Sequence, residues 1–368
     1  MKAIQLVAHG APGTFELRDV PDPQPDAGEV VVQVQSCGLN HLDLWLEEAG
    51  LPIPVKLPRI PGGEIAGKIV QVGESGSAGV PPASSEPGQR DAGAPKWKPG
   101  DAVAVQSNIF CGECEFCRRG EESMCLRGEI LGVQRDGGFA EKVVVPTRAL
   151  VRLPAGVDFD TSAALTLAGS TAMHMLTNRA QVKPGDWVLA IGGASGVGSA
   201  AIQIAKQLGA RVISTGSTEA KRALAQHLGA EFVVDSNKPN WPADIRKYTN
   251  KHGVDLVVEH VGGDVLGKCF DCLARGGTIV TCGATAGRDV PFNLWPFFVK
   301  QHRFIGSYGR DRVDLEKTLA WTAEGKLKPV IDSVFPLDQT AAAFAKLRSR
   351  HCLGKILIEP FEPESESD

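Results

Sequence analysis

The chain has 368 residues, of which 43% are apolar and 22% charged, with a formal net charge of −4. This length allows two domains with separate cores, and the composition is ordinary for a soluble globular protein. The slight acidity argues against a nucleic-acid partner. The N-terminus lacks the apolar run of a signal peptide, and no stretch reaches the roughly 20 apolar residues of a membrane span. We therefore expect a cytoplasmic protein with no membrane partner.

The first 75 residues read as a compact all-β module. Apolar, β-branched segments alternate with Pro- and Gly-containing turns, which is typical of short strands. The expected strands cover residues 3–7, 15–20, 30–37 and 64–72.

A segment rich in Gly, Pro, Ala and Ser follows, between residues 73 and 97. It offers almost no apolar side chain to anchor it in a core, so we expect a disordered surface insertion at about 76–95. A surface loop can lengthen at small entropic cost, which favours a tolerated insertion over a functional lid.

Four cysteines then occur with the spacing C-x2-C-x2-C-x7-C: Cys111, Cys114, Cys117 and Cys125. Four thiolates in one small lobe, about residues 108–128, suit a tetrahedral zinc ion with no open coordination position. We therefore predict one structural zinc per chain. A redox dithiol is the alternative interpretation.

The segment DWVLAIGGASGVGSAAIQIAKQLGA, residues 186–210, predicts a buried strand, a glycine-rich turn and a helix. Gly193 would allow the tight turn, Gly196 the approach of a pyrophosphate, and Gly198 the packing of the helix on the strand. Val197 lies in the same turn, and Gly209 is expected just after the helix. Free N–H groups at a helix start favour an anion, so this turn indicates a dinucleotide site.

From residue 152 onward, strands and helices alternate. Six strands with intervening helices predict a complete doubly wound α/β sheet, and mixed structure returns near the C-terminus. The expected strands cover residues 187–191, 211–215, 232–235, 254–260, 278–282 and 303–308.

These features together resemble the medium-chain dehydrogenase/reductase superfamily over nearly the whole chain. Within it, GLNHLDLW, VVEHVGG and GTIVTCGATAG look like bacterial zinc-binding dehydrogenases close to quinone and enoyl reductases. The resemblance implies a GroES-like β-rich catalytic domain (1–155 and 309–368) and a Rossmann domain (156–308). It also implies a small-molecule substrate, a homodimer, and cofactor contacts from Thr171, Val261 and Gly283.

Alcohol dehydrogenases of this superfamily hold a second, catalytic zinc with a Cys, a His and a further Cys. The corresponding positions here are occupied by Asn40, Gly63 and Leu167. These side chains cannot hold a zinc ion that would polarise a carbonyl. The pattern therefore predicts no catalytic zinc and favours reduction of an activated C=C bond or a quinone.

Asn40 could donate a hydrogen bond to a carbonyl oxygen that gains negative charge. His41 could contact the cofactor pyrophosphate or be a structural histidine, and Asp43 and Glu64 could simply hold the domain interface. A relocated metal bound by His41, Asp43 and Glu64 is a further alternative. His260, at the carboxyl end of a strand, could bind a ligand or only pack.

The second strand of the Rossmann unit ends without the Asp or Glu that would bind a ribose 2′-hydroxyl. Gly216 leaves room there, Ser217 can donate a hydrogen bond, and Lys221 or Arg222 can pair with a 2′-phosphate. We therefore expect NADPH in preference to NADH. A solvent-exposed helix face is the alternative explanation for the two basic residues.

Three functional hypotheses follow. The first is an NADPH-dependent reductase of enones, enoyl thioesters or quinones that works without catalytic zinc. The second is a zinc-dependent alcohol dehydrogenase with displaced ligands, which would need two zinc ions per chain. The third is a non-catalytic NADPH-binding sensor.

Overall fold

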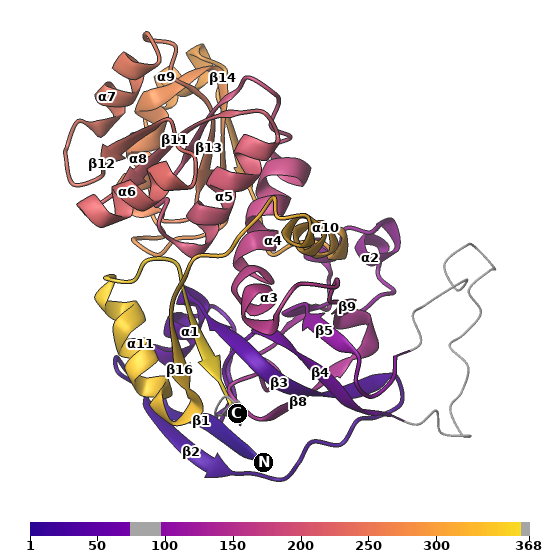
Figure 1. Ribbon diagram of the computed structural model, residues 1–368. Helices are drawn as coiled ribbons and strands as arrows, with labels where there is room; N and C mark the ends of the chain where they lie inside the picture. The colour runs from indigo at the N-terminus through magenta and orange to yellow at the C-terminus, as the bar shows by residue number, and fades with distance from the viewer. Residues whose placement is uncertain (74–96, 362–368) are drawn as a thin grey trace, which may run out of the picture.

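The computed structural model describes residues 1–73 and 97–361, which form two large sheets and two small two-stranded ones, with helices around and between the large sheets (Figure 1). The insertion predicted at 76–95 lies outside the described residues. No helix in the described part of the chain is long and apolar enough to cross a membrane.

One sheet has seven strands in the order β16-β17-β3-β4-β5-β9, with β8 paired to β3. The pairing is antiparallel except between β16 and β17, so a strand from the end of the chain joins strands from its beginning. A hairpin of β1 and β2 lies beside it, and Val, Ile and Leu side chains of the sheet form its core. The strands are β1 (Lys2–Ala8), β2 (Thr14–Asp19), β3 (Glu29–Leu39), β4 (Glu64–Val72), β5 (Ala102–Val105), β8 (Lys142–Pro146), β9 (Leu150–Arg152), β16 (Ile331–Pro336) and β17 (Lys355–Glu359).

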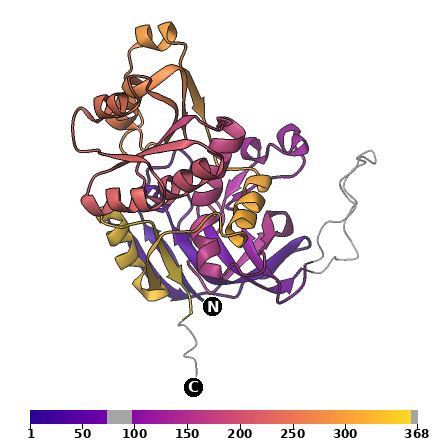
Figure 2. The ribbon, with the colours of Figure 1, turned by 45° about the horizontal axis from the view of Figure 1, so that its top comes forward.

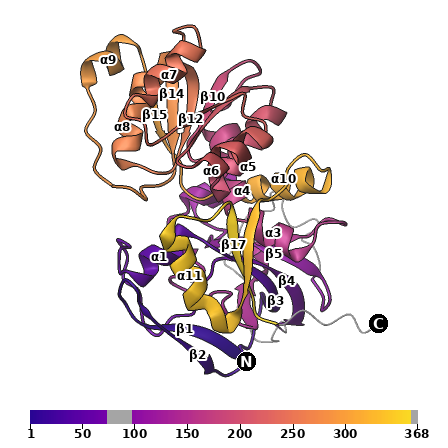
Figure 3. The same cartoon turned by 60° about the vertical axis from the view of Figure 1, so that its left-hand side comes forward.

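This β domain also carries two helices, α1 (His41–Glu47) and α11 (Thr340–Ser349), which lie near each other at one side of the sheet (Figures 1 and 3). The all-β prediction for the first 75 residues missed α1. A local signal for α1 was present, because the carboxylate of Asp43 accepts the backbone N–H of Asn40 at 2.8 Å. An Asn followed three residues later by an acidic residue is a common helix start.

The second sheet is parallel and has six strands in the order β12-β11-β10-β13-β14-β15. This order confirms the doubly wound prediction. From β10 the chain first adds β11 and β12 on one side, and then returns to add β13, β14 and β15 on the other side of β10. The strands are β10 (Trp187–Ala190), β11 (Arg211–Gly216), β12 (Phe232–Asp235), β13 (Val254–Glu259), β14 (Leu273–Thr281) and β15 (Arg303–Gly306).

Helices cover both faces of this sheet, and each face has its own apolar core. Side chains of α5 (Gly196–Gln207) and α6 (Glu219–His227) pack on one face. Those of α7 (Trp241–Tyr248) and α8 (Gly263–Cys272) pack on the other. The short α9 (Leu294–Val299) precedes the edge strand β15 (Figure 3). Both faces of a parallel sheet must be covered, which explains its nearly continuous Val, Ile and Leu strands.

Three helices join the two sheets: α3 (Phe159–Leu165), α4 (Ala168–Met173) and α10 (Arg312–Ala323) (Figures 1 and 3). Helix α3 packs small side chains on β4 and β17, while α4 packs on α5 and α10. The β domain and the parallel sheet are thereby held against a shared set of helices, and a cavity lies between them.

Candidate active site

A cavity of about 430 Å³ lies between the two sheets. Its walls include the carboxyl ends of β10, β11, β13 and β14 on one side, and residues of α1, β17 and the segment after β15 on the other. Ligands of doubly wound proteins bind at this edge, where the strand order reverses. The cavity therefore lies where the topology predicts a dinucleotide and a substrate to meet.

Most of the site residues predicted from sequence line this cavity. The lining residues among them are Asn40, His41, Thr171, Gly196, Val197, Gly216, Ser217, Lys221, Val261 and Gly283. Asp43, Gly193 and Gly198 are not among the lining residues. The structure thus brings together segments that lie more than 200 residues apart in sequence.

The glycine-rich turn is closely packed behind its exposed face. The positive φ of 60° belongs to Gly192, one residue before the predicted turn glycine. A Cβ on Gly193 would lie 2.2 Å from Ser214 Oγ, and one on Gly198 would lie 2.2 Å from Gly192 O. Gly193 and Gly198 therefore allow the turn and the helix to approach the sheet, as expected for Gly198.

Helix α5 begins directly after this turn, and its N-cap Ser195 was not singled out from the sequence. Ser195 Oγ accepts the N–H of Gly198 at 3.0 Å. Ser195, Gly196 and Val197 all face the cavity. The first N–H groups of this 12-residue helix are thus available to an anionic group, and the turn fits a dinucleotide pyrophosphate.

His260 interacts with the same turn. Its Nε2 lies 3.0 Å from Ile191 O and 3.3 Å from Ser195 Oγ, and burial lowers the pKa of its imidazole. A neutral ring that bridges the end of β10 and the helix cap has a clear structural role, although it also lines the cavity.

The end of β11, where the sequence predicted no carboxylate near the 2′-phosphate site, lies beside a carboxylate of the neighbouring strand. Gly216 is paired in the sheet with Asp235 of β12, and Arg222 lies 3.5 Å from that carboxylate. Lys221 Nζ donates to Arg350 O at 2.6 Å. A carboxylate does therefore lie near the predicted 2′-phosphate site, but Arg222 is paired with it and Lys221 lines the cavity.

At the other side of the cavity, Glu64 is fully buried and holds four donors. Its Oε2 contacts Lys355 Nζ at 2.6 Å and accepts from Asn40 Nδ2 at 3.0 Å. Its Oε1 accepts the N–H groups of Leu167 and Ala168 at 2.6 and 3.0 Å. One carboxylate thus ties together β4, β17 and the start of α4, which fits the interface role considered for Glu64.

Asn40 is fully engaged in this network. Its amide hydrogens are directed to Gly38 O at 3.2 Å and Glu64 at 3.0 Å, and its Oδ1 accepts from Lys355 at 2.7 Å. Lys355 also donates to Leu39 O at 2.7 Å. The side chain of Asn40 lines the cavity, but its donors are already used by protein acceptors.

Asp43 and His41 lie at the start of α1. Asp43 accepts from Asn40 N and, at 3.3 Å, from Gly62 N, while burial raises the pKa of its carboxyl to about 6. His41 has an accessible surface but sits within the concave cavity wall. Loss of hydration, followed by repulsion from His260, Lys355 and Arg350, lowers its pKa to about 4. His41 is thus neutral at pH 7.

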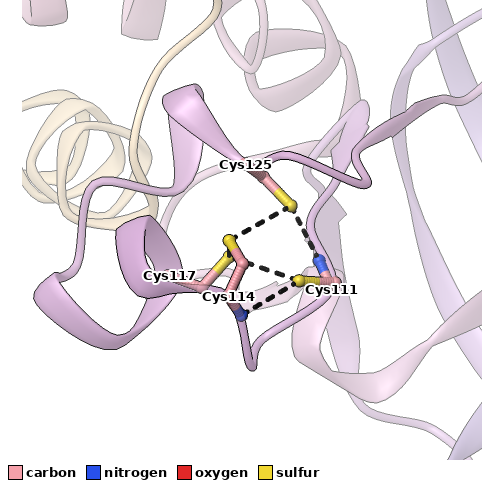
Figure 4. A group of neighbouring side chains, drawn as sticks. All are labelled: Cys111, Cys114, Cys117 and Cys125. Carbon is pink, nitrogen blue, oxygen red and sulfur yellow. Dashed lines mark hydrogen bonds between the residues drawn. The ribbon is translucent and has the colours of Figure 1, made fainter.

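The four cysteines of the predicted zinc lobe converge (Figure 4). The Sγ–Sγ separations are 3.5 Å for Cys114–Cys117, 3.9 Å for Cys111–Cys117 and 4.0 Å for Cys114–Cys125. Tetrahedral zinc with Zn–S bonds of about 2.3 Å requires Sγ–Sγ distances of about 3.8 Å, so the four sulfurs fit this ion.

The lobe is held by α2 (Glu115–Arg119) and a small ladder of β6 (Asn108–Ile109) and β7 (Glu129–Ile130). It protrudes beside α10 (Figures 1 and 2), where Ser123 N donates to Asp311 at 2.8 Å. Its four cysteines do not line the cavity, although Asn108 and Ile130 at its base do. Its position supports a structural role.

In the described residues, a second group of His, Cys, Asp or Glu places its ligand atoms within 4.8 Å of one another: His174, Asp311 and Asp314. The carboxylate of Asp311 accepts from Ser123 N and Asn178 Nδ2. The carboxylate of Asp314 accepts from Asp311 N and contacts His174 Nδ1. This group caps α10 and lies outside the cavity wall. His41, Asp43 and Glu64 do not form such a group.

Comparisons with family models, curated proteins and solved structures all find dehydrogenases and reductases. Residues 26–155 match the family described as alcohol dehydrogenase GroES-like domain, and residues 196–324 match zinc-binding dehydrogenase. An alcohol dehydrogenase of Geobacillus stearothermophilus is 30% identical over 347 residues, covering 94% of this chain and 96% of the relative.

An acryloyl-coenzyme A reductase of Metallosphaera sedula is 29% identical over 359 residues, covering 97% of this chain and 99% of the relative. Among solved structures, an NAD-dependent alcohol dehydrogenase superimposes with a TM-score of 0.88 at 34% identity, covering 98% of this chain and all of the other. The likeness extends over both sheets.

Proposed function

Because the chain belongs to the medium-chain dehydrogenase/reductase family of zinc-binding dehydrogenases, we propose that it reduces activated C=C bonds or quinones with NADPH. The protein is an oxidoreductase of this family; the substrate class and the cofactor preference are our proposals. The substrates would be small enones, enoyl thioesters or quinones. The acryloyl-coenzyme A reductase among the relatives acts on a compound of this chemical type, whereas the alcohol dehydrogenases favour the alternative.

The observation that carries the proposal is the set of side chains in the cavity. Asn40, Gly63 and Leu167 stand at the positions where the family pattern expects zinc ligands. Within residues 1–73 and 97–361, the two groups of potential metal ligands both lie away from the cavity wall. Hydride addition to an enone forms an enolate, whose charge hydrogen-bond donors can stabilise without a Lewis acid.

The cofactor would extend along the carboxyl edge of the parallel sheet. Gly196 and Val197 at the start of α5 would bind the pyrophosphate, and Ser217 and Lys221 the ribose phosphate. Thr171, Val261 and Gly283 line the part of the cavity where the nicotinamide would lie. The bound nicotinamide supplies the hydride; the protein residues orient it and the substrate. His41, being neutral, would contribute a hydrogen bond without charge.

One experiment separates the three functional hypotheses. NADPH oxidation is measured against a panel of enones, enoyl thioesters, quinones and aldehydes, and zinc is quantified on the same sample. Our proposal expects turnover of enones or quinones with one zinc per chain. Alcohol or aldehyde turnover with two zinc ions would support a dehydrogenase with relocated ligands. Tight NADPH binding without turnover would support a sensor.

We further propose that the protein is a homodimer built through the edge of the parallel sheet. Strand β15 is the last strand of that sheet, and α9 beside it exposes several large apolar side chains. Such a patch on an edge strand favours pairing with a second copy. Light scattering of the wild type and of Trp295→Glu would test this, and a monomeric wild type would contradict it. The exposed apolar residues are Leu294, Trp295, Phe298, Val299 and Phe304.

A further inference from the structure

Arg310 is a buried cation that borders the cavity. Only 1% of its surface is exposed, yet it contributes to the cavity wall together with Ser107 and Asn108. Its Nη2 donates to Ser107 Oγ at 2.5 Å and its Nη1 to Asn108 Oδ1 at 3.4 Å. Its Nε has no hydrogen-bond partner among the described residues. Neutral oxygens therefore hold the side chain and leave part of its donor capacity unused.

No carboxylate of the described residues lies within ion-pair distance of this guanidinium. The negative charge of Glu64 is near enough to favour the charged form of Arg310, but Lys355 pairs with that carboxylate at 2.6 Å. Asp314 is held by His174 at 2.7 Å. The nearby negative charges are thus committed to other partners.

Burial lowers the pKa of Arg310 to about 10, so the guanidinium is still charged at neutral pH. An unpaired buried charge is costly unless another charge or a set of hydrogen bonds compensates for it. Ser107 and Asn108 supply part of that compensation. A negatively charged oxygen in the cavity would supply the rest.

The other cavity groups that could stabilise such an oxygen are less suited to it. Asn40 directs both amide hydrogens to protein acceptors. Lys355 donates to Leu39 O and Asn40 Oδ1 and pairs with Glu64. His41 is neutral at pH 7 because its pKa is about 4. Among the buried groups of the described cavity wall, Arg310 combines a charge with a free N–H. The cations Lys221 and Arg350 also line the cavity, but Lys221 is only partly buried and Arg350 is exposed.

We propose that Arg310 is the electrophilic catalytic residue of this cavity, whose guanidinium binds the carbonyl oxygen of an α,β-unsaturated substrate and stabilises the enolate. In the reaction, the β carbon gains a hydride and a new C–H bond, and the C=C electron pair moves toward the carbonyl. The carbonyl oxygen then carries the negative charge facing Arg310, the nicotinamide is left oxidised, and water protonates the α carbon. This inference rests on the proposed function.

The test compares Arg310→Met and Arg310→Lys with the wild type on a neutral enone and on an enone that carries a carboxylate. Arg312→Gln is the matched control, because Arg312 lies two residues away, outside the cavity wall, and pairs with Glu316 at 2.8 Å. We expect Arg310→Met to lower kcat about 100- to 1,000-fold on both enones, as for the loss of an oxyanion donor. Arg310→Lys should retain an intermediate rate, and the control should be unchanged.

Two further measurements separate catalysis from structure. The Kd for NADPH should be unchanged in Arg310→Met, and added guanidinium ion at low millimolar concentration should raise its kcat several-fold. Unaltered kcat in Arg310→Met would overturn the inference while leaving the proposed function intact. A loss confined to KM for the carboxylate-bearing enone would also overturn it, because Arg310 would then bind a substrate carboxylate. A wild type that reduces no enone, enoyl thioester or quinone would refute both.

Discussion

The ion pair between Glu64 and Lys355 gives a quantitative prediction about stability. Glu64 is 0% exposed and Lys355 4% exposed, and their charged atoms are 2.6 Å apart. With an effective dielectric constant of about 20, Coulomb's law gives an attraction of about 6 kcal/mol, which is offset by the desolvation of both groups. The net contribution of the pair is therefore small, but either charge alone would be strongly destabilising.

We expect Lys355→Met to lower the free energy of unfolding by about 3–5 kcal/mol, because it leaves the Glu64 carboxylate buried without its cation. The N–H groups of Leu167 and Ala168 and the amide of Asn40 would still contact Glu64, so the native fold should persist. Chemical denaturation followed by tryptophan fluorescence and by circular dichroism would measure the change.

The matched control is the double variant Glu64→Gln with Lys355→Met, which removes both charges. We expect it to recover most of the stability that Lys355→Met loses, so the two substitutions should be clearly non-additive. If Lys355→Met costs less than about 1 kcal/mol, or if the double variant is the sum of the single ones, the reasoning from a buried ion pair is refuted.

Three other predictions follow from the sequence and the structure. Cys114→Ser should release the single zinc of the lobe and lower the melting temperature, and a wild type purified without chelators that contains no zinc would contradict the assignment. Lys221→Ala should weaken NADPH relative to NADH by about tenfold in kcat/KM, as for one charge-assisted hydrogen bond, and a wild type that prefers NADH would refute this. Deletion of residues 76–95 should leave the melting temperature and turnover nearly unchanged; a loss of several degrees would show that the segment packs against the protein.

Local sequence patterns determined much of this protein. The glycine-rich turn, the apolar strands on either side of it and the spacing of the four cysteines are short-range features. Each specifies its geometry through backbone freedom, burial or ligand spacing within a few residues. The order of strands and helices was sufficient to predict the doubly wound sheet. Helix α1 was missed although its signal, Asn40 followed three residues later by Asp43, is local.

Only the tertiary structure showed which side chains meet across the cavity. Lys355 reaches Glu64 because β17 joins β3 in the seven-stranded sheet, and Asp235 lies beside Gly216 because β12 pairs with β11. Arg310 has no sequence motif. Folding buries its charge beside two neutral residues and leaves no carboxylate of the described chain to pair with it. Only this environment makes Arg310 a candidate site residue. Long-range pairing and burial depend on the whole fold, so no local pattern encodes them.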